Sequence, residues 1–196
     1  MNDKQIMSAL RKSGAIRSGH FQLTSGRHSD TYIQCARVLE DPVLTTKLAR
    51  EMVARLPENL RPDFVIAPAV GGIIIGFAVA KAFKRGKGLP FVFSERQDGV
   101  MVLRRAFEIP ADARVLVVED VVTTGGSVQE VINLVDQADA MVVGVTSLID
   151  RGGKKAFTAP YYPLLRMEVA SWAPEECAQC AKGTALDSPG SRRLTK

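Results

Sequence analysis

The 196-residue sequence is poor in cysteine and histidine, with three of the first and two of the second. We expect no secretory leader, because the first residues, MNDKQIMSALRK, are charged where a leader would be apolar. Sparse cysteines and this charged start favour a reducing compartment, so we expect a cytoplasmic protein. A single domain of this length buries roughly 70% of its unfolded surface and needs neither disulfides nor metals to fold.

Short motifs of several enzyme classes are also missing. The sequence contains no G-x-x-x-x-G-K-[ST], no G-x-G-x-x-G and no H-E-x-x-H, which leaves nucleotide triphosphatases, dinucleotide-binding enzymes and zinc proteases without support. One uncharged stretch, residues 64–80, approaches the length of a membrane span, but Pro68 and three glycines interrupt it. We interpret it as a buried strand, a glycine turn and an apolar helix, and expect no membrane partner.

Long blocks of one charge are absent as well. Lys and Arg number 26 against 21 Asp and Glu, which gives a net charge of +5 and favours an anionic partner. The basic residues are scattered in ones and twos, without the block that is typical of a nucleic-acid-binding arm. We therefore expect small anionic substrates in a pocket and no nucleic acid.

Apolar strand and helix patterns alternate from residue 63 onward. Strands are predicted at residues 64–67, 91–93, 115–119 and 141–148, and helices at residues 72–83 and 127–137. This alternation predicts an α/β fold in which a central parallel sheet is flanked by helices.

The N-terminal third follows a different pattern. Asn2 or Asp3 can cap a first helix, and Asp41-Pro42 can begin a second. Between these helices, two extended runs on either side of a turn predict a hairpin that forms a small flap. Residues 100–107 follow another turn and predict a mobile basic hairpin, whereas the chain after Trp172 is expected to be irregular.

The segment VLVVEDVVTTGGSVQEVI, residues 115–132, has the order of a ligand-binding turn. A buried strand ends at Glu119 and Asp120, and residues 123–127 lead directly into an amphipathic helix. Ligands of parallel sheets bind beyond the carboxyl ends of the strands, and the N-terminus of a helix attracts phosphate. We therefore predict a phosphate site at residues 123–127.

The two acids before this loop would repel an anion unless they serve another group. Sugar hydroxyls, a divalent cation or a developing positive charge would each explain them. A ribose phosphate satisfies both halves of the segment, with its phosphate in the loop and its diol at the carboxylates. The alternative is an ordinary polar strand end followed by an ordinary helix entry.

This segment resembles the phosphoribosyl pyrophosphate signature of type I phosphoribosyltransferases, which implies that fold. The resemblance implies that Glu119 and Asp120 contact the ribose hydroxyls beside the reacting carbon and that the loop surrounds the 5-phosphate. With an arginine that precedes the mobile hairpin, the implied phosphoribosyl pyrophosphate site comprises Glu119, Asp120, Val121, Val122, Thr123, Thr124, Gly125, Gly126, Ser127 and Arg96.

Further segments are similar to orotate phosphoribosyltransferases over most of the chain. Residues 19–35 resemble the N-terminal hood of that family, residues 66–72 its pyrophosphate loop and residues 95–109 its mobile catalytic loop. IDRGGK at residues 149–154 matches a region in which an arginine after the last core strand contacts orotate. The resemblance implies that Arg104 and Arg105 act in catalysis and that Thr123, Arg151, Tyr32 and Ile33 contact orotate.

The resemblance implies transfer of a phosphoribosyl group from phosphoribosyl pyrophosphate to orotate, which gives orotidine 5'-monophosphate and pyrophosphate. It also implies Mg²⁺ held mainly by substrate oxygens, with metal-binding side chains unknown, and a homodimer with shared active sites. We expect one domain over residues 1–196, with a hood at about 1–40, a core at about 41–171 and a tail at about 172–196.

The sequence also departs from the family's pattern. Thr24 stands where many bacterial members have a lysine in the hood, the mobile loop has only arginines, and Tyr32-Ile33 replaces an aromatic pair. These departures indicate a divergent branch. The alternatives are a transferase for another base, or a regulator that binds nucleic acid and senses phosphoribosyl pyrophosphate.

The remaining cysteines and histidines have weaker signals. Cys177 and Cys180 have the spacing of half a zinc site, and only Cys35, His20 and His28 could complete it. We favour ordinary reduced thiols, while a dimer-bridging metal or a redox pair stays open. His28 lies beside a turn, and we expect it to be solvated rather than in contact with a substrate phosphate.

Overall fold

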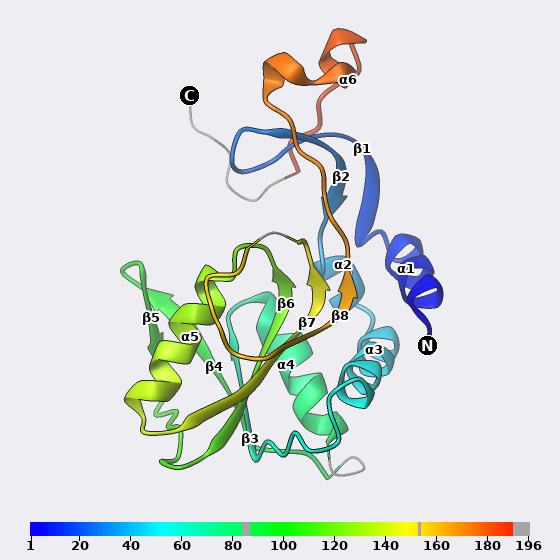
Figure 1. Cartoon of the computed structure of the whole chain (residues 1–196). Coiled ribbons are helices and arrows are strands. Elements are labelled where there is room, and N and C mark those ends of the chain that lie inside the picture. Colours follow the sequence, from blue (N-terminus) through cyan, green and yellow to red (C-terminus); the bar gives the residue numbers. More distant parts are fainter. Residues whose placement is uncertain (84–86, 153, 190–196) are drawn as a thin grey trace.

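The computed structural model describes residues 1–83, 87–152 and 154–189. A body built on one sheet lies below a smaller lobe (Figure 1). This hood lobe consists of an antiparallel hairpin, β1 (Ile16–Gln22) and β2 (His28–Ile33), together with residues 170–189 of the tail. The end of the predicted tail, residues 190–196, lies outside the described residues.

The body is organised around a six-stranded sheet of order β5-β4-β3-β6-β7-β8. All neighbouring strands pair in parallel except β5, which pairs antiparallel with β4 at one edge. This mostly parallel sheet confirms the predicted α/β class. The strands are β3 (Phe64–Pro68), β4 (Phe91–Gln97), β5 (Val100–Leu103), β6 (Arg114–Val122), β7 (Met141–Asp150) and β8 (Tyr161–Arg166).

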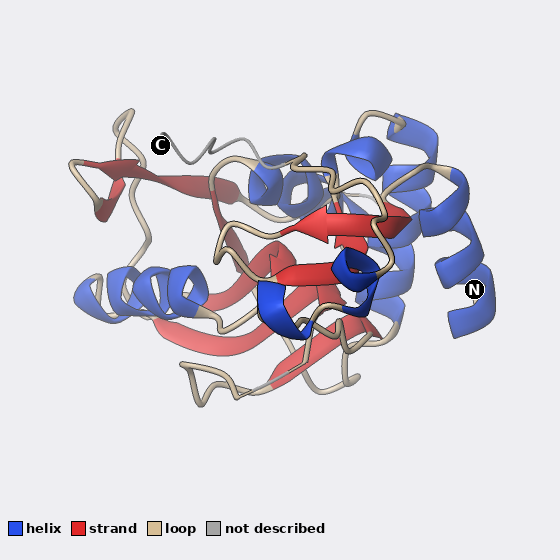
Figure 2. Ribbon diagram, turned by 90° about the horizontal axis from the view of Figure 1, so that it is seen from above, coloured by secondary structure: helices blue, strands red, loops and turns tan. Residues whose placement is uncertain are grey.

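Helices cover both faces of this sheet, as Figure 2 shows from above. One apolar cluster joins α1 (Asp3–Lys12), α2 (Ala36–Leu39), α3 (Pro42–Ala54) and α4 (Gly71–Ala82) to one face, and a second joins α5 (Gly126–Gln137) to the other. On β6, Leu116 and Val118 belong to the first cluster and Val115 and Val117 to the second. A strand that is buried on both faces reads as a continuous apolar run, which is why the sequence predicted it.

Local signals explain where the first long helices begin. Asn2 and Gln5 form a reciprocal capping box at the start of α1. The Asp41 carboxylate accepts hydrogen bonds from the Val43 and Leu44 amides, and Pro42 occupies the first turn of α3. The two predicted N-terminal helices are confirmed. None of the helices in the described ranges combines the length and apolar composition that a membrane span requires.

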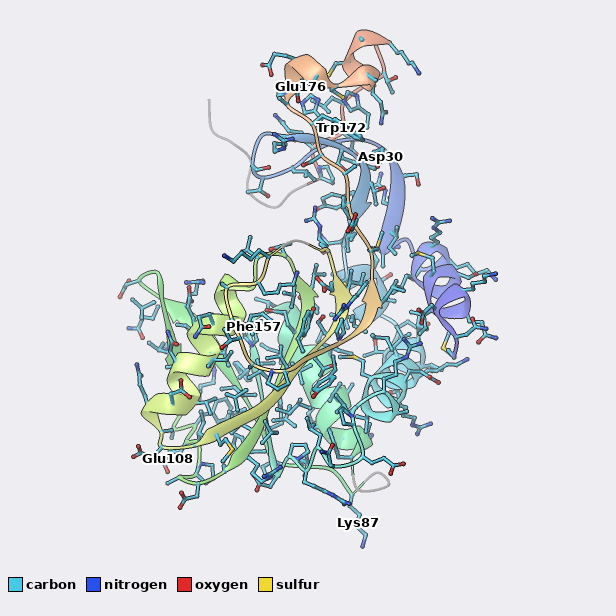
Figure 3. The ribbon with its side chains drawn as sticks, in the orientation of Figure 1. Asp30, Lys87, Glu108, Phe157, Trp172 and Glu176 are labelled. Atoms are coloured by element: carbon cyan, nitrogen blue, oxygen red, sulfur yellow. The ribbon has the colours of Figure 1, made fainter. Side chains whose placement is uncertain are left out.

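The tail is more ordered than we expected. Its backbone pairs with the hairpin on two sides, through Trp172 with His28 and through Asp187 with Phe21, and it includes a 3-10 turn, Pro174–Glu176, and α6 (Ala178–Ala181). Figure 3 shows Trp172 and Glu176 in this lobe, well above Phe157 of the body.

Strand β8 was not predicted, so the assumption that β7 is the last core strand was wrong. Pro163 lies within β8, and a proline usually argues against a strand because it cannot donate a ladder hydrogen bond. An edge strand tolerates proline, and β8 is the edge strand beside β7.

Candidate active site

The predicted phosphate loop lies between the end of β6 and the start of α5. Gly125 occupies the N-cap of α5 with a φ of 81°, and no side chain caps this helix. The first N–H groups of α5 therefore keep their capacity to bind an anion at the positive end of the helix dipole. Residues 121–127 line a cavity of about 250 Å³, together with Arg96 and Glu130. We call it the phosphate cavity, after the predicted phosphate loop.

Two features make glycine necessary at position 125. Its left-handed φ is costly for any residue with a Cβ, and a Cβ there would lie 2.5 Å from the Phe157 ring. A Cβ on Gly126 would meet nothing within 4 Å. The segment after β7 also supports the loop, since the Ala156 amide donates to the Thr124 carbonyl at 2.7 Å.

The paired acids face the start of α4. A Cβ added to Gly71 would collide with the Asp120 carboxylate. A Cβ added to Gly72 would lie 3.4 Å from Glu119 Oε1. The acids therefore lie against residues 66–72, the predicted pyrophosphate loop, in which the Ala69–Val70 peptide is cis. Burial raises the pKa of Glu119 well above its usual value, and the charge of Asp120 raises it further.

A second, larger cavity of about 750 Å³ lies between the hood lobe and the carboxyl ends of the strands. It shares Val121, Thr123 and Thr124 with the phosphate cavity, so the two cavities adjoin. The structure brings four predicted orotate contacts to this cavity together with Asp120: Tyr32, Ile33, Thr123 and Arg151.

Arg151 is one of two cationic residues of the described ranges that line the larger cavity. Its backbone amide donates to the Val122 carbonyl at 2.9 Å, which fixes the residue beside the phosphate loop. Its Nε is buried and makes no hydrogen bond to any described residue, and burial lowers the pKa of its guanidinium. Arg151 therefore brings a positive charge to the wall of the larger cavity, while its Nε itself is covered by protein.

The predicted loop arginines fall into two groups. Arg96 lines the phosphate cavity, where its Nη2 lies 2.7 Å from Glu130 Oε2. Arg104 and Arg105 line neither cavity. Arg105 makes two hydrogen bonds of 3.0 Å to Glu95 and has a φ of 61°, followed by Ala106 at 54°. Two successive left-handed residues are a strained arrangement for side chains with a Cβ.

Sequence reasoning missed several residues of the larger cavity. Those residues are Gln22, Leu23, Ser25, Gln34, Cys35, Gly152, Lys154 and Ser171. Lys154 follows Arg151 within the IDRGGK segment, so a signal for it was available, whereas nothing in the sequence connects Ser171 to the hood. Lys155 was also missed, and its Nζ donates to the Thr123 carbonyl at 2.8 Å.

The expectation that His28 is solvated was wrong. His28 is 4% exposed, and its ring lies edge-on to that of His20 at 5.0 Å between centroids. The tail covers both rings, because Cys177 and Cys180 lie against them. No local sequence pattern could show that a segment more than 150 residues away returns to this turn.

The fold and this arrangement of loops define a class of protein. The family model of the phosphoribosyl transferase domain matches residues 41–176, which include the whole sheet and both loops at its carboxyl edge. The chain belongs to this family.

Curated relatives narrow the class to orotate phosphoribosyltransferases. The chain is 46% identical over 194 residues to the orotate phosphoribosyltransferase of Heliobacterium modesticaldum, and the match covers 98% of this chain and 100% of that one. It is 45% identical over 193 residues to that of Chlorobium phaeobacteroides, covering 98% and 97%. The solved orotate phosphoribosyltransferase of Aeropyrum pernix shares the fold, with a TM-score of 0.69, 24% identity and coverage of 82% and 93%.

Proposed function

We propose that this chain transfers the phosphoribosyl group of phosphoribosyl pyrophosphate to orotate, giving orotidine 5'-monophosphate and pyrophosphate. The observation that carries the proposal is the position of Arg151 in the wall of a cavity that adjoins an uncapped helix N-terminus. One end of the combined site suits a phosphate and the other suits a carboxylated base. The curated relatives, which are named for this activity, support the same reading.

The acids between these two ends suit the sugar. Positive charge develops on the ribose ring as its bond to pyrophosphate lengthens, and fixed carboxylates stabilise that charge electrostatically. Asp120 lines the larger cavity and Glu119 the smaller one, so a ribose that spans the two would lie beside both. No covalent intermediate on the chain is needed, because orotate itself is the nucleophile.

The base end favours an anion over a neutral ring. Arg151 and Lys154 both line the larger cavity, and a charge-assisted hydrogen bond is roughly twice as strong as a neutral one. Orotate carries a carboxylate that uracil and hypoxanthine lack. Tyr32 lines the same cavity and supplies one aromatic face for the pyrimidine.

We infer that Mg²⁺ is the cofactor and that substrate oxygens hold most of it. Within the described ranges, the one group of three or more side chains that could bind a metal is His20, His28, Cys177 and Cys180, in the hood lobe. No three carboxylates of the described residues converge in the active site, and a sparse donor set fits Mg²⁺ shared with substrate phosphates and water. When bound, the ion neutralises charge on the departing pyrophosphate.

We also infer a cytoplasmic homodimer in which the loop that bears Arg104 and Arg105 acts in the partner's site. These arginines line neither cavity of their own chain. Val70, Ile74 and Phe77 form an exposed apolar stripe on α4, with exposed fractions of 79%, 47% and 60%. Such a stripe beside the pyrophosphate loop suits a contact with a second copy of the chain.

A base panel tests the activity. The purified full chain, with Mg²⁺ and phosphoribosyl pyrophosphate, is offered orotate, uracil, hypoxanthine and xanthine, and pyrophosphate release is recorded. We expect turnover with orotate alone and none when Mg²⁺ is omitted. Turnover with another base would replace the proposed substrate, and binding of phosphoribosyl pyrophosphate without turnover would favour a regulator.

Subunit mixing tests the shared site. Chains with Arg105→Ala are mixed with chains with Gly125→Ala, so that a mixed dimer contains one site free of both changes. We expect activity well above that of either variant alone. If the loop acts within its own chain, every site of the mixed dimer is damaged and no activity returns.

A further inference from the structure

Four side chains of the hood lobe converge on one point. His20 Nε2 lies 3.2 Å from His28 Nδ1, 3.3 Å from Cys177 Sγ and 3.6 Å from Cys180 Sγ, and Cys180 Sγ lies 3.2 Å from His28 Nδ1. All four ligand atoms lie within 4.8 Å of one another. We call this group the His/Cys cluster.

These distances agree with the edges of a tetrahedron around a zinc ion. Zinc lies about 2.3 Å from a thiolate sulfur and about 2.0–2.1 Å from an imidazole nitrogen. In tetrahedral geometry those lengths place the ligand atoms about 3.3–3.8 Å apart. Four of the six separations, 3.2–3.6 Å, lie at or just below that range, and the other two are no longer than 4.8 Å.

The surroundings of His20 orient it as a ligand. Its Nδ1 lies 2.9 Å from the Thr184 carbonyl, and a carbonyl can only accept, so this nitrogen carries the proton. In the neutral ring Nε2 then has its lone pair directed at the centre of the cluster. A carbonyl that holds the second ring nitrogen is a common outer partner of metal-bound histidine.

Local structure brings the four residues together. A register shift in β1 between Ser18 and Phe21 allows two successive residues, His20 and Phe21, to be buried, although neighbours in a regular strand face opposite sides. His28 begins β2. Cys177 is the N-cap of α6 and Cys180 lies within it.

The hood lobe also lacks an apolar core of its own. Only Ile16 and Ile33, at the ends of its strands, reach an apolar cluster of the body, and residues 180–188 of the tail are all exposed. Small units with too little apolar surface are commonly stabilised by disulfides or metals. The structure links none of the three cysteines in a disulfide, and a bound metal would supply this stabilisation.

We propose that the His/Cys cluster binds one structural Zn²⁺ that fastens the C-terminal tail to the hood hairpin. Two imidazoles and two thiolates are a typical zinc set, and four protein ligands leave no open position for catalysis. The site is separate from the proposed Mg²⁺, which lies with the substrate. The same lobe contributes Tyr32 and Ser171 to the larger cavity, so the zinc fixes the wall on the base side.

Metal content is the primary test. The full chain is purified under reducing conditions without added chelator, and zinc per chain is measured by plasma mass spectrometry. We expect one zinc per chain, and Co²⁺ substitution should give the strong visible absorption of a tetrahedral site with thiolate ligands. A chain that contains no zinc and binds none on titration would overturn the proposal, as would a Cys177–Cys180 disulfide that reforms in preference to metal binding.

Cysteine variants assign the ligands. Cys177→Ser and Cys180→Ser should each weaken zinc binding by roughly 100-fold or more, since even outer partners of metal ligands cost 10–100-fold. Cys35→Ser is the matched control, because Cys35 lies outside the cluster, and it should keep the full zinc content. Loss of zinc from the control, or its retention in both cluster variants, would overturn the assignment. These readouts do not depend on activity or on the proposed reaction.

Discussion

The body and the hood lobe are stabilised in different ways, and they serve different ends of the substrate pair. The body buries its strands between two apolar clusters, and the phosphate loop and acids project from that rigid framework. The hood lobe is joined by backbone pairing, polar contacts and the His/Cys cluster. We infer from this difference that the core fixes the elements proposed to hold the sugar phosphate, whereas the lobe proposed to enclose the base depends on the His/Cys cluster.

The largest effect is expected from a substitution in the body, at the phosphate loop. Gly125→Ala places a Cβ in a left-handed conformation and against the Phe157 ring. A displacement of about 1 Å at a reacting site can cost about 100-fold in rate. We expect a loss of that order in kcat/KM for phosphoribosyl pyrophosphate, measured by steady-state kinetics.

Gly88→Ala is the matched control for that change. It adds the same methyl group at the same left-handed φ of 81°, where the nearest atom would lie 3.5 Å away, and Gly88 lines neither cavity. We expect nearly normal kinetics. Equal damage from the two substitutions would mean that the loop geometry does not position the phosphate.

The phosphate cavity also shows what a sequence can predict. A strand, a loop and a helix that are adjacent in the chain form most of it, so a local pattern contained that part, whereas Arg96 comes from β4. Strands β3, β4, β6 and β7 follow from periodicity, whereas β5 was predicted only as part of a mobile hairpin and β8 was missed because of Pro163. The packing of Phe157 on Gly125 was not predictable, since it depends on where the segment after β7 returns.

The hood lobe could be predicted only in part. Its hairpin follows from two extended runs and a turn, yet the contact between His20 and Cys177 joins residues 157 positions apart. The register shift in β1 that buries His20 leaves no sequence signature. For this reason the sequence could name His20, His28 and Cys35 only as candidates to complete the site, and the fold brings the two histidines to the Cys-x-x-Cys pair.

The next largest effect is expected at Arg151, and it should change the use of orotate without changing the binding of phosphoribosyl pyrophosphate. Arg151→Gln removes the charge and the buried Nε donor. A hydrogen bond to a charged group contributes about 1.5–3 kcal/mol, so we expect kcat/KM for orotate to fall roughly 10- to 150-fold. Binding of phosphoribosyl pyrophosphate, measured by calorimetry without orotate, should be unchanged, and a parallel loss there would contradict the assigned division.

A smaller effect is expected from the mobile loop. Arg105→Ala removes an exposed ion pair with Glu95, and such pairs contribute little to stability. We expect no measurable shift in Tm but a fall in turnover of about tenfold, because a cation that stabilises the leaving group is lost. Arg104→Ala should behave alike. Unchanged kinetics in both variants would remove this loop from the mechanism.

The smallest expected effect concerns the stability of the body. Burial and then the charge of Asp120 raise the pKa of Glu119 above its unfolded value, so folding favours the protonated acid. That contribution is complete below the unfolded pKa and is lost as pH rises through the folded pKa. At pH 8 Glu119→Gln should therefore unfold at a Tm a few degrees above wild type, since about 1 kcal/mol corresponds to roughly 2–4 °C, even as turnover falls. The gain should shrink as the pH is lowered toward the unfolded pKa. A difference in Tm that is independent of pH would mean that packing, rather than the buried charge, separates the two proteins.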